Sequence, residues 1–214
     1  MELTFHGHAC VSLRGEQGVV VMDPYKSGAL GGAIGFSPVE VQADWVTISH
    51  YHVDHAHVSP ALGAPTVVDK SGLFGGLEFR CRSTYHDRFK GARMGMTTMT
   101  SFEFDGLRIA HLGDIGCDLI REDVEALGPV DILIFPTGGT YTLGSADAPA
   151  VLEALRPRLA IPVHYECAGC RLGLEPVQAL EAHIKDVERP GGSCWTSGQG
   201  LPSGNKVLVL EPAN

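Results

Sequence analysis

Residues 50–55 read His-Tyr-His-Val-Asp-His, which places four side chains able to bind a metal within six positions. The apolar run before them predicts a strand, so the cluster is expected in a loop at that strand's carboxyl end. Because residues two apart in extended backbone point the same way, His50 and His52 can bind one metal while Asp54 and His55, turned by the loop, face a second. A hydrogen-bonded surface loop is the structural alternative, but three crowded imidazoles gain nothing evident without a cation.

Three more candidate ligands come directly after predicted strands: His86, Asp114 and His164. Each would project from the edge of a sheet toward a common centre. Taken singly, each has an ordinary structural interpretation, as a hydrogen-bonded loop histidine for His86 and His164 and as a helix N-cap for Asp114. Together with the 50–55 cluster, they supply enough donors for two metal ions.

The composition limits the classes of partner. Sixteen basic and twenty-five acidic side chains give the 214-residue chain a formal net charge of −9, and no basic run stands out. An acidic chain repels a phosphate backbone, so extended nucleic acid is not expected as a partner. A small-molecule substrate, even an anionic one, remains compatible because bound cations would offset the charge locally. With 44% hydrophobic and 19% charged residues, a single globular domain over 1–214 is predicted.

The chain start and the cysteines bear on location. The first thirteen residues lack the basic segment and long apolar stretch of a signal peptide, and no stretch approaches transmembrane length, so we expect a cytoplasmic protein that does not enter a membrane. Six cysteines are too few for a disulfide scaffold of this size. Cys167 and Cys170 form a single CxxC that could bind zinc or form a disulfide, and two free thiols are the preferred interpretation.

Strands cluster early in the chain and later alternate with helices. Runs rich in β-branched or apolar residues predict strands at 3–5, 10–13, 19–22, 45–48, 78–84, 98–104, 107–111, 132–135, 159–163 and 207–210. Asp105-Gly106 suits a two-residue hairpin turn. Apolar spacing predicts helices over 120–127, over 151–155 with Ser145 as a possible cap, and over 177–187. This order suggests an α/β fold of two facing sheets with helices outside, a four-layer αββα sandwich.

The metal-binding pattern resembles a known family. The order His50-x-His52-x-Asp54-His55, then an isolated histidine, a Gly-Asp pair after a strand and a late strand-terminal histidine is similar to the metallo-β-lactamase superfamily. Further segments are similar to the small bacterial branch that includes ascorbate-6-phosphate lactonase, namely Gly7-His8, Asp23-Pro24, Tyr85-His86-Asp87, His111-Leu112-Gly113-Asp114, the stretch 138–142 and Pro162-Val163-His164-Tyr165.

The resemblance implies a ligand set and a reaction. It places His50, His52 and His86 on a first metal, Asp54, His55 and His164 on a second, and Asp114 between them. Nitrogen and oxygen donors suit two divalent ions, zinc first and manganese or iron next. The expected enzyme is a binuclear metal-dependent hydrolase.

The expected reaction is hydrolysis by a metal-bridged hydroxide. The bond cleaved would be an ester, lactone or phosphodiester of a small and anionic metabolite. Asp54 would accept a proton from the water, Asp114 is the other catalytic candidate, and Asp23 or Asp87 would orient ligand imidazoles.

Two residues are candidates for substrate contact. Arg93 could clamp a carboxylate or phosphate, although solvation on a surface loop is the simpler interpretation. Tyr141 follows a Gly-Gly pair and could donate to a developing oxyanion, a role that the resemblance supports. His8 is expected to be structural or to support a ligand rather than to bind metal itself.

Two other functions compete with hydrolysis of a small metabolite. One is a non-hydrolytic, iron-binding redox protein that uses the same pocket, and the other is a nuclease, which the negative charge and short length disfavour. Relatives of this size commonly self-associate, so a homo-oligomer is possible in this interpretation.

Overall fold

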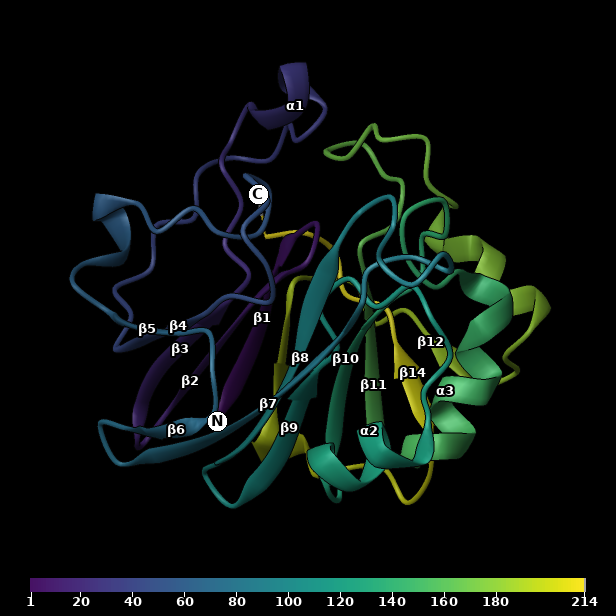
Figure 1. The fold of residues 1–214 in the computed structure, drawn as a ribbon. Coiled ribbons are helices and arrows are strands. Elements are labelled where there is room, and N and C mark those ends of the chain that lie inside the picture. Colours follow the sequence, from purple (N-terminus) through teal and green to yellow (C-terminus); the bar gives the residue numbers. More distant parts are fainter. Residues whose placement is uncertain (214) are drawn as a thin grey trace.

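The computed structural model describes residues 1–213, except for the side chain of Gln199. Two sheets pack face to face (Figure 1). The six-stranded sheet has the order β13-β1-β2-β3-β4-β5, with β1 Glu2–Gly7, β2 Cys10–Gly15, β3 Gly18–Met22, β4 Trp45–Thr47, β5 Thr66–Val68 and β13 Cys194–Thr196. The eight-stranded sheet has the order β12-β14-β11-β10-β9-β8-β7-β6, with β6 Gly72–Phe74, β7 Leu77–Tyr85, β8 Met96–Phe104, β9 Leu107–His111, β10 Ile132–Pro136, β11 Leu159–Val163, β12 Val187–Glu188 and β14 Lys206–Leu208.

The main core lies between the two sheets. Side chains of a strand alternate between faces, so Val20 and Met22 of β3 enter this core while Val19 and Val21 face outward. The outward side chains form a second cluster, which a long irregular segment covers with residues that include Phe36. Both faces of the six-stranded sheet are therefore buried.

The longer helices cover the outer face of the eight-stranded sheet. α2 (Arg121–Leu127), α3 (Ala148–Leu155) and the 3-10 helix η3 (Val177–Ala182) lie on that side (Figure 1). Over the other sheet, the outer layer consists of a loop, the single turn α1 (Ala29–Gly32) and the short 3-10 helix η1 (Pro60–Leu62). The predicted sandwich is thus confirmed, with one outer layer largely irregular. In the described part of the chain, no helix has the length and apolar character needed to cross a membrane.

Most predicted elements are present, and the hairpin is confirmed. Asp105 and Gly106 have φ values of 49° and 76°, as a tight two-residue turn between β8 and β9 requires. The helix predicted over 177–187 is wrong. After η3 the chain becomes extended, and β12 pairs in parallel with β14. The apolar spacing there reflects burial against the core, which a 3-10 turn and a strand satisfy equally well. The short strands β5, β6, β12 and β13 were not predicted.

Another detail of the prediction concerns the start of α3. Ser145 does not cap this helix. It begins the 3-10 turn η2 (Ser145–Asp147), and Asp147 occupies the N-cap position of α3. The Asp147 carboxylate instead accepts a hydrogen bond of 2.8 Å from the Gly144 N–H.

Close backbone contacts bring the ends of neighbouring strands together. β9, β10 and β11 run parallel, as do β3, β4 and β5, so their carboxyl ends meet at one edge of the sandwich. Beyond β10, a Cβ added at Gly138 would lie 2.2 Å from the carbonyl oxygen of His164, which follows β11. A glycine at 138 therefore permits the loop after β10 to lie directly on the end of β11.

Gly138→Ala is expected to lower the free energy of unfolding by about 1–3 kcal/mol, because backbone rather than a flexible side chain must move. The measurement is urea denaturation followed by circular dichroism. Gly204→Ala is the matched control, since a Cβ there meets nothing within 4 Å. Equal stability of the two variants would contradict the close approach.

Candidate metal centre

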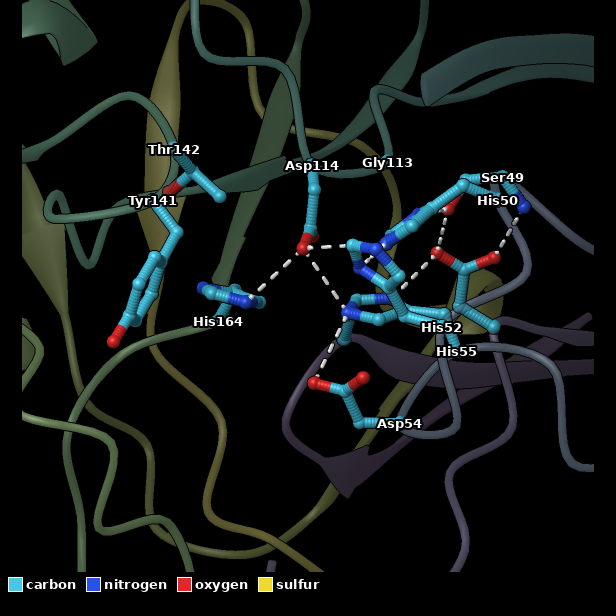
Figure 2. A network of polar contacts seen from close by, with 12 residues as sticks. Ser49, His50, His52, Asp54, His55, Gly113, Asp114, Tyr141, Thr142 and His164 are labelled. Carbon is cyan, nitrogen blue, oxygen red and sulfur yellow. Dashed lines mark hydrogen bonds and ion pairs between the residues drawn. The ribbon is translucent and has the colours of Figure 1, made fainter. Parts of the chain in front are cut away.

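Loops after four strands deliver the predicted ligands to one place. The 50–55 cluster follows β4 of the six-stranded sheet, while His86 follows β7, Asp114 follows β9 and His164 follows β11 of the eight-stranded sheet. Both sheets therefore contribute, and residues up to 114 positions apart in the sequence meet at the shared edge. The structure brings all seven predicted ligands together, and Figure 2 labels all of them except His86.

The Asp114 carboxylate lies at the middle of the cluster. Figure 2 shows its oxygen facing several imidazoles. Its Oδ2 atom is 3.1 Å from His55 Nε2, 3.2 Å from His164 Nε2, 3.3 Å from His86 Nε2 and 3.9 Å from His50 Nε2. Some of these imidazoles belong to the first predicted ligand group and others to the second. Asp114 therefore lies where a bridging carboxylate is required.

One group of donors matches the predicted first metal position. Ligand atoms of His50, His52 and His86 all lie within 4.8 Å of one another. His50 Nε2 is 2.8 Å from His52 Nδ1. His50 and His86 are buried, whereas His52 is partly exposed at the floor of a cleft. This group is therefore reachable from solvent on the His52 side.

The second group contains a residue that the sequence interpretation set aside. His8, in the turn between β1 and β2, joins His55 and His164 with ligand atoms within 4.8 Å of one another. His8 Nε2 lies 3.2 Å from His55 Nε2 and 3.1 Å from Asp54 Oδ2, and the latter two atoms are 3.7 Å apart. Atoms bound to one zinc at about 2.0–2.1 Å are separated by roughly 3.2–3.5 Å in tetrahedral geometry, so this spacing suits a common ion. The Gly7-His8 pair was the signal in the sequence.

Hydrogen bonds fix the orientation of three imidazoles. His55 Nδ1 donates to Asp23 Oδ2 at 3.0 Å, and His50 Nδ1 donates at 2.9 Å to Ser49 Oγ, which itself donates to Asp23 at 2.5 Å. His86 Nδ1 donates at 3.1 Å to the carbonyl of Tyr141. With these Nδ1 atoms protonated, the Nε2 lone pairs of all three rings face the centre, as metal ligation requires.

Asp23 therefore has the orienting role that was predicted for Asp23 or Asp87. The interpretation of Asp87 as an orienting group is wrong. Its carboxylate accepts four backbone N–H bonds from its own loop, from Phe89, Gly91, Arg93 and Met94, at 2.7–3.0 Å. Asp87 thus shapes the loop over residues 87–94 and contacts no ligand ring.

The charges of the cluster are strongly coupled. Burial would raise the pKa of Asp114, but the neighbouring imidazoles of His164 and His55 outweigh it and hold this pKa well below its usual range. Burial would lower the pKa of His55, yet the Asp114 and Asp23 carboxylates raise it well above its usual value. Burial and the charge of His55 lower the pKa of His50 to about 3, so this imidazole is neutral near pH 7. The Asp114 and Asp23 carboxylates thus favour the protonated, positively charged form of the His55 imidazole. A metal ion bound at His55 would take the place of that proton.

Unpartnered atoms test whether the residues fit a cation. Three buried polar side-chain atoms lack a hydrogen-bond partner in the described structure: His86 Nε2, Asp114 Oδ1 and His164 Nδ1. All three belong to predicted ligands, although buried polar groups elsewhere in proteins are nearly always paired. The donors, their spacing and these atoms together fit divalent metal ions.

Three of the eight non-glycine residues with positive φ in the described chain lie at the centre. His8, Asp23 and His164 have φ values of 53°, 45° and 54°, in the left-handed region that residues other than glycine rarely adopt. His164 N–H also donates to the His8 carbonyl at 2.7 Å, which joins the two sheets at the centre. Such strain persists only where the surrounding structure enforces it, and functional sites are the usual location.

A cleft of about 550 Å³ opens above the centre. His52, Asp54 and Asp114 lie on its floor, and Tyr141 lies on its wall with its hydroxyl pointing away from Asp114 (Figure 2). Arg93 lines an adjacent cleft instead, with its guanidinium 3.7 Å from the centre of the Phe89 ring. Tyr141 is therefore close enough to touch a bound molecule, whereas Arg93 is not part of this cleft.

The other histidines and the CxxC have ordinary surroundings. His111 Nε2 donates to the Ala9 carbonyl at 3.0 Å, and its Nδ1 accepts from the Gly113 N–H at 3.0 Å, so it is a satisfied buried histidine as expected. Cys167 and Cys170 are free thiols, also as expected, and Cys170 Sγ lies 3.7 Å from His8 Nδ1.

Comparison with known proteins agrees with this geometry. A family profile described as "Beta-lactamase superfamily domain" matches residues 2–164, which is most of the chain. This protein belongs to the metallo-β-lactamase superfamily. The finer likeness to ascorbate-6-phosphate lactonase stays a prediction.

Individual members of the superfamily resemble the whole chain. A Thermotoga maritima protein described as a Zn-dependent hydrolase of the superfamily is 32% identical, with a TM-score of 0.79 over 98% of both chains. A UPF0173 metal-dependent hydrolase of Staphylococcus aureus (strain MRSA252) is 25% identical over 229 residues, covering 90% of this chain and 99% of its own. An isothiocyanate hydrolase from Delia radicum gut bacteria shares the fold, with 18% identity and a TM-score of 0.66 over 100% of this chain and 98% of its own.

Asp114→Ala is expected to abolish stable binding of both metals, because the carboxylate faces imidazoles of both groups. Elemental analysis after zinc loading and gel filtration should show a fall from about two equivalents to less than one. Asp186→Ala, at an exposed acidic side chain, is the control and should keep both ions. Retention of two equivalents by folded Asp114→Ala protein would exclude a bridging role.

His8→Ala is expected to weaken binding of one metal only, by roughly 10–100-fold, because the first donor group does not include His8. Titration of metal-free protein with Zn²⁺ in a calorimeter measures both sites. His6→Ala removes a nearby buried imidazole that binds Ser12 Oγ at 2.8 Å, and should leave both affinities unchanged. Two unaltered sites in the His8 variant would show that His8 is structural.

Proposed function

We propose that this metal-dependent hydrolase of the metallo-β-lactamase superfamily uses two divalent metal ions to cleave an ester, lactone or phosphodiester bond of a small molecule. The observation that carries the proposal is the position of Asp114 Oδ2, which faces imidazoles of both donor groups beneath an open cleft. Two donor groups that share one carboxylate at the floor of a cleft suit hydrolysis by activated water better than simple metal storage.

Each part of the site has a task in this reaction. Bound metal ions would lower the pKa of water and polarise the scissile carbonyl or phosphoryl oxygen. His50, His52 and His86 would hold one ion, and Asp54, His55, His164 and His8 the other, with Asp114 shared.

The chain's own groups would guide the water and its proton. Asp54 lines the cleft, and its Oδ2 lies 3.1 Å from His8 Nε2, so its carboxylate is placed beside the second donor group to orient a water molecule and receive its proton. Asp23 keeps His55 and, through Ser49, His50 in the orientation that ligation needs. Tyr141 is the candidate hydrogen-bond donor at the cleft wall.

Further features belong to the same proposal. Donors that are all nitrogen or oxygen, with six imidazoles among them, favour zinc, and manganese or iron would also bind. The setting we propose is the cytoplasm, with a small-molecule partner. The iron-redox and nuclease alternatives have no specific observation in their favour, and the cleft lining described here has no lysine or arginine to bind a phosphate backbone.

His52→Ala is expected to reduce kcat/KM for a responsive ester by at least about 100-fold, because His52 is both a first-group donor and part of the cleft floor. The test compares zinc-, manganese- and iron-loaded proteins on panels of aryl esters, lactones and phosphodiesters. His183→Ala, at an exposed histidine, serves as control. Full activity of the His52 variant, or oxygen consumption by iron-loaded protein without any hydrolysis, would overturn the proposal.

A further inference from the structure

Exposed apolar side chains gather around the cleft above the metal centre. Leu30, Tyr51, Val53 and Tyr141 are 50%, 70%, 43% and 37% exposed, and all four line this cleft. Large apolar groups are rarely left open to water together on a soluble protein unless they contact a ligand or partner. A cleft of about 550 Å³ is within the range that holds a small molecule.

Part of the apolar wall of the cleft is built by two loops that are joined by hydrogen bonds. Leu30 lies on the α1 turn, and Leu172 lies in the loop after β11. Gly35 N–H donates to the Gly169 carbonyl at 2.8 Å, and Arg171 N–H donates to the Ala33 carbonyl at 2.9 Å. The apolar wall is therefore preformed rather than assembled by a ligand.

The backbone conformation of Leu30 is one that a leucine rarely adopts, which indicates that its side chain has a specific role. Its φ of 54° and ψ of 45° are left-handed, a region where glycine or asparagine is less strained than leucine. The neighbouring Gly31 and Gly32 have the positive φ expected of glycine. An exposed leucine at such a position suits contact with an apolar ligand, since it contributes little to the core.

The charges in the cleft are confined to the metal donors. Among the described lining residues, the titratable side chains other than tyrosine are His52, Asp54, His86, Asp114 and His164. Three arginines come near the cleft without lining it: Arg88, which pairs with Asp147 at 2.6 Å, Arg93, which stacks on Phe89, and Arg171, which donates to the Gly32 carbonyl at 3.4 Å. A carboxylate or phosphate remote from the scissile bond would therefore lose hydration without gaining a cationic partner.

We infer that the substrate carries an uncharged, apolar group beside the bond that is cleaved, as in an alkyl or aryl carboxylic ester, thioester or lactone. The inference rests on the proposed hydrolysis and narrows its substrate class, replacing the anionic metabolite expected from the sequence. The carbonyl faces the metal donors, and the apolar chain lies along Leu30, Met94 and Leu172. Water adds its oxygen to the acyl carbon, the bond to the leaving oxygen or sulfur breaks, and a proton passes to that leaving group.

The test is kcat/KM of the zinc-loaded protein on p-nitrophenyl acetate, butyrate, hexanoate and octanoate, and on p-nitrophenyl hemisuccinate. Burial of each methylene should raise kcat/KM roughly two- to fourfold until the cleft is filled, the upper value corresponding to about 0.8 kcal/mol. Hemisuccinate, which matches butyrate in length but carries a charge, should be cleaved at least about tenfold more slowly. A flat series, or a preference for hemisuccinate, would overturn the inference while leaving the hydrolase intact.

Leu30→Asn keeps a residue that tolerates the left-handed backbone and removes the apolar wall. It should reduce the ratio of kcat/KM for hexanoate to that for acetate by about threefold or more. Leu73→Asn is the matched control, since Leu73 is 72% exposed on β6 and does not line this cleft, and its ratio should equal that of the wild type. An unchanged ratio in the Leu30 variant would contradict the inference.

Direct binding separates failure of the inference from failure of the proposed hydrolysis. If no ester, lactone or phosphodiester is turned over, the hydrolase proposal fails, and calorimetry with hexanoate and succinate still measures the preference of the cleft. Tighter binding of hexanoate supports the apolar site, whereas tighter binding of succinate rejects it.

Discussion

Imidazole nitrogens and carboxylates are crowded around one oxygen of Asp114. This crowding constrains the loops at the edge of the sandwich where the parallel strands end. Four imidazole Nε2 atoms lie within 3.1–3.9 Å of that oxygen, drawn from both sheets. Removing so many polar groups from water has a high cost in free energy unless opposite charges compensate it. The metal ions that we propose would provide that compensation, and the hydrogen bonds made by Nδ1 of His50, His55 and His86 leave the Nε2 atoms of these rings facing inward.

The rest of the fold is arranged to deliver these groups. Parallel strands in each sheet end at one edge, and the loops beyond them carry the ligands. Asp23 fixes the orientation of two imidazoles by hydrogen bonds, directly for His55 and through Ser49 for His50. The strained backbones of His8 and His164 are joined by a hydrogen bond of 2.7 Å, so the two sheets are fastened where the centre lies. Rigidity of this kind favours a site with a fixed geometry.

The sequence was sufficient for most of this arrangement because the ligands follow strands that are strongly patterned. The runs before His50, Asp114 and His164 are apolar and rich in β-branched residues, and their parallel pairing places the following residues at one edge.

Residues whose role depends on tertiary packing could not be predicted in this way. His8 was assigned a supporting role since a lone Gly-His pair does not show which sheet edge faces it. The 177–187 segment has helical spacing, but pairing with β14 prevailed over local preference. The apolar wall, too, is formed by Leu30 and Leu172, which are distant in the sequence and come together only in the fold.

The hydrogen bond between the His164 N–H and the His8 carbonyl also bears on when the metal centre can form during synthesis of the chain. The donors of this centre are distributed over most of the chain, and the group that contains His164 is not complete until β11 has emerged and paired beside β10. Non-local pairing of this kind is slow compared with local helix formation. A nascent chain therefore lacks the complete centre, and the metal content of the centre is set by the finished sandwich, from the ions that the surrounding compartment supplies at that moment.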